Sequence, residues 1–221
     1  MNDFGGSWRS ASGFGGSQVS VISLTGGGGG GGATTTWNPS DKSAAISLSS
    51  GNLTATGSSA TFAGVRSIAS ASSGKKYWEI HADTINATSQ ISTGAGIAAS
   101  SLDFPAGYTS GVSWFSGGLI YVNGVSVTDT GISWAQGDTM CFAVDIDNNL
   151  LWIRANGGNW NANAGLDPAS GSGGIDISTR GAGALFAMAT VGTSGSGNDV
   201  FTANFGATSY AFSVPSGFGN W

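Results

Sequence analysis

Residues 137–160 read GDTMCFAVDIDNNLLWIRANGGNW, and this stretch decides the fold class. Two apolar runs, 139–147 and 150–154, flank an Asp-Asn-Asn turn, and a Gly-Gly-Asn-Trp loop follows them. In the first run the apolar residues alternate between two faces, which is the period of a β-strand. One face carries Met140, Phe142, Val144 and Ile146, and the other carries Cys141 and Ala143. The stretch therefore predicts a β-hairpin that is buried on at least one side.

Similar short runs fill the chain from Trp37 onward. Further strands are expected at 44–48, 52–56, 61–69, 76–84, 94–99, 112–115, 119–122, 185–190 and 200–205. Asn123-Gly124 follows one of them and is a dipeptide favoured in two-residue hairpin turns. Uninterrupted helical spacing of apolar residues is absent. Many short strands without helices predict an all-β, antiparallel β-sandwich.

The composition excludes several classes of protein. The 221 residues include 39 glycines, and only 9% are charged, against roughly 25% in ordinary globular domains. Low charge with 40% hydrophobic residues argues against a disordered chain. The formal charge of −5 gives no basic footprint for a phosphate backbone, so no nucleic-acid partner is expected. The single cysteine, Cys141, is predicted to be a buried packing residue rather than a reactive thiol.

The first 35 residues differ from the rest. They are rich in Gly and Ser and contain seven consecutive glycines at 26–32, which favour a flexible coil. They lack a basic start followed by an apolar stretch, so neither a Sec signal peptide nor membrane insertion is expected. We divide the chain into a docking segment and linker, 1–35, and a β-sandwich, 36–221. Anchors for docking to an assembly in the manner of an added strand are Phe4, Trp8, Phe14, Val19, Val21 and Leu24. The alternative is a tail without a partner.

Six motifs in order resemble the SPRY family. They are GKKYWEI at 74–80, GIA at 96–98, YVNG at 121–124, GD at 137–138 with DID at 145–147, LWIRANG at 151–157, and NFG at 204–206 with PSGF at 215–218. The resemblance covers about 37–221. It implies a concanavalin-like jelly roll that serves binding rather than chemistry, without a cofactor.

The style of the sequence departs from that of eukaryotic SPRY domains. Its charge-poor, Ala/Ser/Gly-rich strands and glycine-rich leader resemble SPRY-like domains of bacteriophage and prophage virion proteins. This resemblance implies a tail-fibre, adhesin or decoration protein, located in the virion after synthesis in the host cytoplasm. Other virion proteins and a homo-oligomer are then the expected partners.

Catalytic patterns are nearly missing. Glu79 and His81 fall on one face of a predicted strand, but no turn motif marks a nucleophile beside them. We interpret both as solvent-facing or bonded within the sheet, and we predict no catalytic residue and no enzyme.

Metal binding is not predicted either. The run Asp145-x-Asp147-x-Asn149 resembles the start of a calcium loop, but the Gly and Glu that an EF-hand needs later are missing. A hairpin turn in which Asp and Asn bond the backbone fits better. A different surface site, formed by convergence of Asp167 and Asp176, remains an alternative.

Two loops carry residues suited to ligands. Asn159, Trp160 and Asn161 combine an apolar ring with directional hydrogen bonds, although Trp160 could instead tuck against the sandwich edge. Tyr108 and Trp114 form a second such patch. Trp78 and Trp152 lie inside strands and are predicted core residues.

The leading hypothesis is a non-enzymatic, virion-associated module whose leader docks to a phage particle and whose loops recognise a host-surface glycan or protein. The first alternative is a structural decoration or fibre subunit that binds only its neighbours. The second is an intracellular adaptor that binds a peptide.

Overall fold

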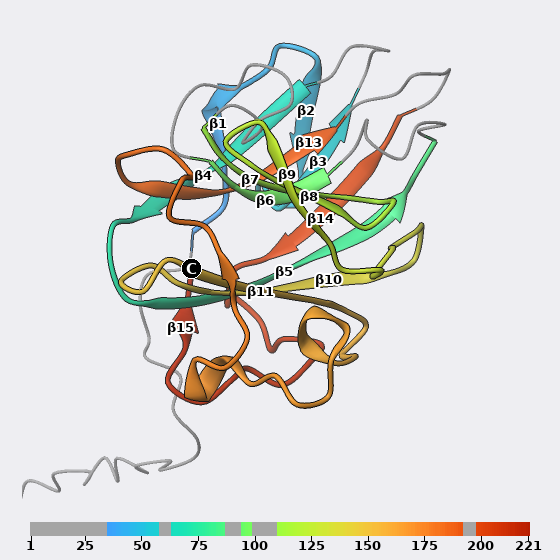
Figure 1. The fold of residues 1–221 in the computed structure, drawn as a ribbon. Helices are drawn as coiled ribbons and strands as arrows, with labels where there is room; N and C mark the ends of the chain where they lie inside the picture. The colour runs from blue at the N-terminus through green and yellow to red at the C-terminus, as the bar shows by residue number, and fades with distance from the viewer. Residues whose placement is uncertain (1–34, 58–62, 87–93, 99–109, 192–197) are drawn as a thin grey trace, which may run out of the picture.

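The computed structural model describes residues 35–57, 63–86, 94–98, 110–191 and 198–221, and it shows two packed antiparallel sheets. Figure 1 shows the sheets one above the other. Sheet A runs in the order β1 (Trp37–Lys42), β4 (Ala63–Ala71), β13 (Leu185–Val191), β6 (Gly94–Ala98), β7 (Gly111–Phe115), β8 (Leu119–Val122) and β9 (Val125–Asp129). Sheet B runs in the order β12 (Ile175–Asp176), β11 (Leu150–Ala155), β10 (Thr139–Asp145), β5 (Lys75–Thr84), β14 (Val200–Asn204), β3 (Thr54–Gly57) and β2 (Ile46–Ser49). The two-residue strand β15 (Gly219–Asn220) pairs in parallel with β5.

The predicted all-β sandwich is confirmed. Every expected strand that lies among the described residues is present, with ends within two residues of those predicted. Strands β1, β9, β12 and β15 were not predicted, nor were the short 3-10 turns η1 (Trp160–Ala162) and η2 (Pro168–Ser170). In the part of the chain that the structure describes, no helix has the length and apolarity to cross a membrane.

The core between the sheets is built around aromatic rings. Trp78 and Phe142 stack with ring centroids 4.8 Å apart, and Trp221 packs edge-on against Trp78 at 4.7 Å. Trp114 adds an edge-on contact with Phe142 at 5.8 Å. All four side chains are buried. The even-numbered residues of β10 therefore point inward, as the alternation predicted.

The β10–β11 hairpin has the predicted turn chemistry. Asp145 accepts hydrogen bonds from the backbone N–H of Asn148 at 3.1 Å and from its side-chain amide at 2.8 Å. Asn149 then adopts a left-handed φ of 56°, which Asn tolerates better than most residues. Because this turn fixes the register, Cys141 lies opposite Arg154 on β11.

A third layer covers part of the outer face of sheet B, the face that points away from sheet A. Figure 1 shows two segments beneath this sheet, the loop after β11 in orange and the chain after β14 in red. We call residues 206–213 the strap. The strap and its neighbours bury a second apolar cluster, formed by Tyr77, Cys141, Ala143, Trp152, Trp160 and Phe218. Sheet B is consequently buried on both faces near its centre.

Candidate functional site

The strap is held on sheet B by the carboxylate of Glu79. This side chain is only 3% exposed. It accepts hydrogen bonds from the backbone N–H groups of Ala211 at 2.8 Å and Phe212 at 2.9 Å, and from the Tyr77 hydroxyl at 2.7 Å. Three donors directed at one buried carboxylate replace the hydrogen bonds with water that it loses on burial. Of the two alternatives for Glu79, the solvent-facing one was wrong because the strap covers the side chain, whereas its bond to Tyr77 lies within the sheet.

Two further side chains fix the strap on either side of Glu79. The Arg154 guanidinium donates to the carbonyl of Ser213 at 2.7 Å and lies 4.2 Å from the ring centre of Trp160. The Asn204 side-chain amide donates to the carbonyl of Ser209 at 3.1 Å. The strap thus crosses β14, β5 and β11 with its main chain bonded to side chains of the sheet.

Burial raises the pKa values of two tyrosines and of the cysteine in this region. Burial raises the pKa of Tyr77 and of Tyr210 well above that of an ordinary tyrosine, so both hydroxyls stay protonated. The Tyr210 hydroxyl donates to the carbonyl of Tyr77 at 3.0 Å. Burial also raises the pKa of the Cys141 thiol, which disfavours the reactive thiolate. Cys141 is buried, as predicted.

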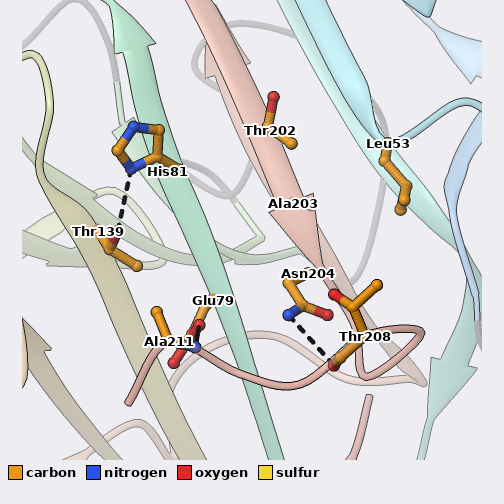
Figure 2. Close-up of a pocket in the computed structure, with 9 residues that line it drawn as sticks. All are labelled: Leu53, Glu79, His81, Thr139, Thr202, Ala203, Asn204, Thr208 and Ala211. Carbon is orange, nitrogen blue, oxygen red and sulfur yellow. Dashed lines mark hydrogen bonds between the residues drawn. The ribbon is translucent and has the colours of Figure 1, made fainter. Parts of the chain in front are cut away.

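Beside the strap, the outer face of sheet B is hollowed. This hollow has a volume of about 320 Å³, at the lower end of the range for ligand pockets. Figure 2 shows its residues gathered from β5, β10 and β14 and from the strap. The lining is formed by Leu53, Glu79, His81, Thr139, Thr202, Ala203, Asn204, Thr208 and Ala211.

The polar groups of the hollow are arranged by hydrogen bonds to one another. Nδ1 of His81 lies 3.0 Å from Oγ1 of Thr139, and Oγ1 of Thr202 lies 2.9 Å from Oγ1 of Thr54 (Figure 2 for the first pair). A bond between two hydroxyls uses one hydroxyl hydrogen, so the other stays available as a donor. Nε2 of His81 bonds to none of the described residues. The hollow therefore offers ordered donors and acceptors among methyl groups.

The geometry does not assemble a hydrolytic triad. A hydroxyl nucleophile needs a base whose second nitrogen is oriented by a third group. Thr139 and His81 provide the first two members. However, both oxygens of Glu79 accept hydrogen bonds from the strap, one of them also from Tyr77, and neither bonds to His81. Among the described residues, no group orients His81 for general-base catalysis.

The predicted ligand residues Trp114 and Trp160 are both buried. Trp114 is fully buried between the sheets, and its indole N–H donates to the carbonyl of Ile132 at 3.1 Å. It leaves no surface for a ligand, so the structure corrects its assignment to a binding loop. Trp160 is 9% exposed and packs edge-on against Tyr77. Of the two readings for Trp160, the structure favours the one in which it tucks against the sheet.

The asparagines on either side of Trp160 differ. Asn161 bonds the edge of β11, because its side chain accepts from the N–H of Ile153 at 2.9 Å and donates to the carbonyl of Gly173 at 3.0 Å. Its role is thus to hold the loop. Asn159 is exposed and remains a candidate ligand residue. Tyr108 and the anchors Phe4, Trp8, Phe14, Val19, Val21 and Leu24 lie outside the described residues.

The carboxylates considered for calcium serve local turns. Asp167 accepts from the N–H of Ala169 at 2.9 Å, and Asp176 accepts from the N–H of Ser178 at 2.8 Å. Within the described ranges, no three His, Cys, Asp or Glu side chains gather in a group that could hold a metal ion.

Comparison with known proteins assigns the fold. No protein-family model and no curated protein matches the chain. Among solved structures, it is similar to the SPRY domain of human HERC1, with a TM-score of 0.57, 15% identity, and coverage of 78% of this chain and 99% of that domain. The PSpry domain of TRIM65 gives a TM-score of 0.50 at 14% identity, with coverage of 77% and 92%. The fold is therefore a SPRY-like β-sandwich, as the six motifs predicted.

Sequence reasoning missed the hollow. Its members are threonines and a histidine on different strands, and no local motif unites them. The available signal was the alternation of polar and small residues in Thr54-Ala55-Thr56 and Thr202-Ala203-Asn204, which marks a polar outer face. That signal gives the face of the sheet, but the position of the strap creates the hollow.

Proposed function

We propose that the protein is a non-enzymatic binding module that engages a partner protein through the hollow beside the strap. The observation that carries this proposal is the set of hydrogen-bonded side chains around His81, whose Nε2 is available to a ligand. The SPRY-like fold supports it, because SPRY domains commonly serve as protein-binding modules. A rigid sheet also favours affinity, since little side-chain freedom is lost on binding.

The lining of the hollow favours a protein over a glycan. Sugar rings bind well against the faces of Trp, Tyr or Phe, and none of the nine lining residues is one of these. Leu53, Ala203 and Ala211 provide apolar surface beside the polar groups. Such a mixture suits the main chain and small side chains of a polypeptide.

Blocking the hollow tests this function. Thr202→Tyr places a ring in the hollow, whereas Ser47→Tyr adds the same ring to an exposed position on β2. A displayed library of protein fragments is sorted against the full chain, and affinities are then measured for both variants. We expect Thr202→Tyr to weaken binding by about tenfold or more, or about 1.4 kcal/mol, and Ser47→Tyr to leave it unchanged. Fragments that bind both variants equally, or a turnover that His81→Ala abolishes, would contradict the proposal.

We further propose that the module belongs to a virion and is attached by its leader. The charge-poor, glycine-rich composition and the aromatic anchors Phe4, Trp8 and Phe14 support this location. Deletion of residues 1–25 should leave the melting temperature of the sandwich unchanged and prevent incorporation into the particle. Normal incorporation of the truncated chain would place the attachment on the sandwich.

A further inference from the structure

Two neighbouring rows of side chains cross the outer face of sheet B at right angles to its strands. The strap row consists of Asn204, Glu79, Cys141 and Arg154, which lie opposite one another on β14, β5, β10 and β11. The open row consists of Thr54, Thr202, His81 and Thr139, which lie opposite one another on β3, β14, β5 and β10. The two rows are two residues apart along the strands, or roughly 6.8 Å.

The strap row shows how this face binds a polypeptide. Its side chains hold the strap by main-chain groups alone: Asn204 donates to carbonyls, Glu79 accepts from N–H groups, and Arg154 donates to a carbonyl. These contacts follow one another along the strap from residue 208 to residue 213. These main-chain bonds do not depend on the side chains of the bound segment, and Tyr210 and Phe212 of the strap add side-chain packing against sheet B.

The open row has similar groups at the same spacing. Adjacent members are about 4.8 Å apart, the distance between neighbouring strands. Hydrogen bonds join Thr54 to Thr202 and His81 to Thr139, but the side chains of Thr202 and His81 are not bonded to each other. Between these two pairs, Nε2 of His81 and the threonine hydroxyls can bond to an N–H or a carbonyl. The hollow lies over this part of the row.

The charge around the open row is negative. Asp83 lies two residues beyond His81 along β5, where the pairing of β5 with β14 shifts register; it is exposed and forms no hydrogen bond or ion pair with the described residues. No Lys or Arg lines the hollow. The six described cations bond elsewhere: Lys42 to Ile46, Arg66 to Asp41, Lys75 to Asp145, Lys76 to Asn220, Arg154 to Ser213 and Arg180 to Asn149. A basic partner would thus meet an unpaired carboxylate.

We propose that the open row binds a basic polypeptide segment of the partner protein, which lies alongside the strap and crosses the strands in the same way. The main chain of this segment bonds to His81 and Thr202, and a Lys or Arg of the segment pairs with Asp83. The inference rests on the proposed function and specifies its ligand.

A library of displayed random 12-residue peptides tests the inference. Peptides are selected against the full chain, and their affinities are measured by fluorescence polarisation against the chain and its variants. We expect enrichment of Lys and Arg, and a loss of affinity of about tenfold in both His81→Ala and Asp83→Lys. Asp176→Lys makes the same charge change at an exposed site on β12 and should leave affinity unchanged. Backbone N-methylation of the selected peptides should also weaken binding, because the main chain loses donors.

The outcomes separate the two proposals. One outcome would overturn this inference and leave the proposed function standing. In it, the selected peptides lose affinity for Thr202→Tyr, but they show no enrichment of Lys and Arg and bind Asp83→Lys with unchanged affinity. If no peptide is selected, or if every peptide binds Thr202→Tyr as well as the unmodified chain, the inference falls. The proposed function falls only if displayed protein fragments also ignore Thr202→Tyr. Thermal melts of each variant verify that it is folded.

Discussion

The strap row and the open row lie on the same face of the same sheet, yet only one is covered by the chain itself. The strap row carries Glu79 and Arg154, which are 3% and 7% exposed and bond to the strap from both sides. The open row carries threonines and His81, which are only partly buried. A buried charge must be compensated, whereas a hydroxyl can stay in contact with water. Residue type therefore distinguishes the two rows: the charged side chains mark the part of this face that the chain itself covers, and the threonines and His81 mark the part that is available to a partner.

The largest effect is expected at Glu79, in the covered row. Glu79→Ala leaves two N–H groups of the strap and the Tyr77 hydroxyl without their acceptor, so we expect a loss of about 4 kcal/mol in the free energy of unfolding. Urea denaturation measures it, and hydrogen exchange at Ala211 and Phe212 should accelerate. A loss below about 1 kcal/mol would mean that the strap contributes little to stability, as for an ordinary surface substitution.

A somewhat smaller loss is expected at Trp152, under the same layer. Its ring is fully buried, and its indole N–H donates to the carbonyl of Ser172 at 2.8 Å. Trp152→Ala should reduce the free energy of unfolding by about 3 kcal/mol, since the covering loop can partly collapse into the space. Phe142→Ala, between the sheets, is the matched comparison and should cost at least as much. A larger loss at Trp152 would make the third layer the more rigid one.

The rate of thiol labelling at Cys141 measures how often the strap opens while the sandwich stays folded. Cys141 is the only cysteine in the chain, and burial raises its pKa. Its labelling should be slow at pH 7 and should rise by about tenfold per pH unit up to pH 8.5, whereas the labelling of a free thiol, whose pKa is about 8.5, begins to level off in this range. In Glu79→Ala the rate should increase by about tenfold or more, because local opening exposes the thiol. Equal rates in both proteins would show that Glu79 does not control access to Cys141.

The smallest effect is expected in the open row. His81→Ala and Thr202→Ala each remove one hydrogen-bonding side chain from a solvated surface, so the free energy of unfolding should fall by less than about 1 kcal/mol. Thermal melts monitored by circular dichroism measure this. A loss of several kcal/mol would assign the open row to the structure and remove the contrast with the strap row.

The sequence predicted the strands well because their signals are local. Alternation within 139–147 identified β10 and its inward face, and the Asp-Asn-Asn turn identified its partner. The outward residues Cys141 and Ala143 are also apolar, and together with Tyr77 and Trp152 they are a signal from which a second buried face could have been predicted. That signal indicated burial but did not say which segment provides it.

The candidate site was less predictable because its contacts join distant parts of the chain. The bond from Phe212 to Glu79 spans 133 residues, and no periodicity within one segment reports such a contact. The Asn- and Trp-rich loop at 159–161 had the composition of a binding loop. In the structure, Trp160 and Asn161 use the same chemistry to attach that loop to sheet B.

The position of β5 has a consequence for the order of synthesis. This strand pairs with β10, β14 and β15, and Trp78 within it packs against Trp221, whose indole N–H donates to Ser67 and Ala69. During translation, β5 emerges from the ribosome long before β10, β14 and β15 do. The nascent chain therefore carries an unpaired apolar strand until β10 has emerged and an incompletely paired one until residue 221 has emerged, and such late, distant pairing slows folding and favours aggregation. We expect efficient folding during translation to depend on a chaperone that shields β5 while the rest of the chain is made.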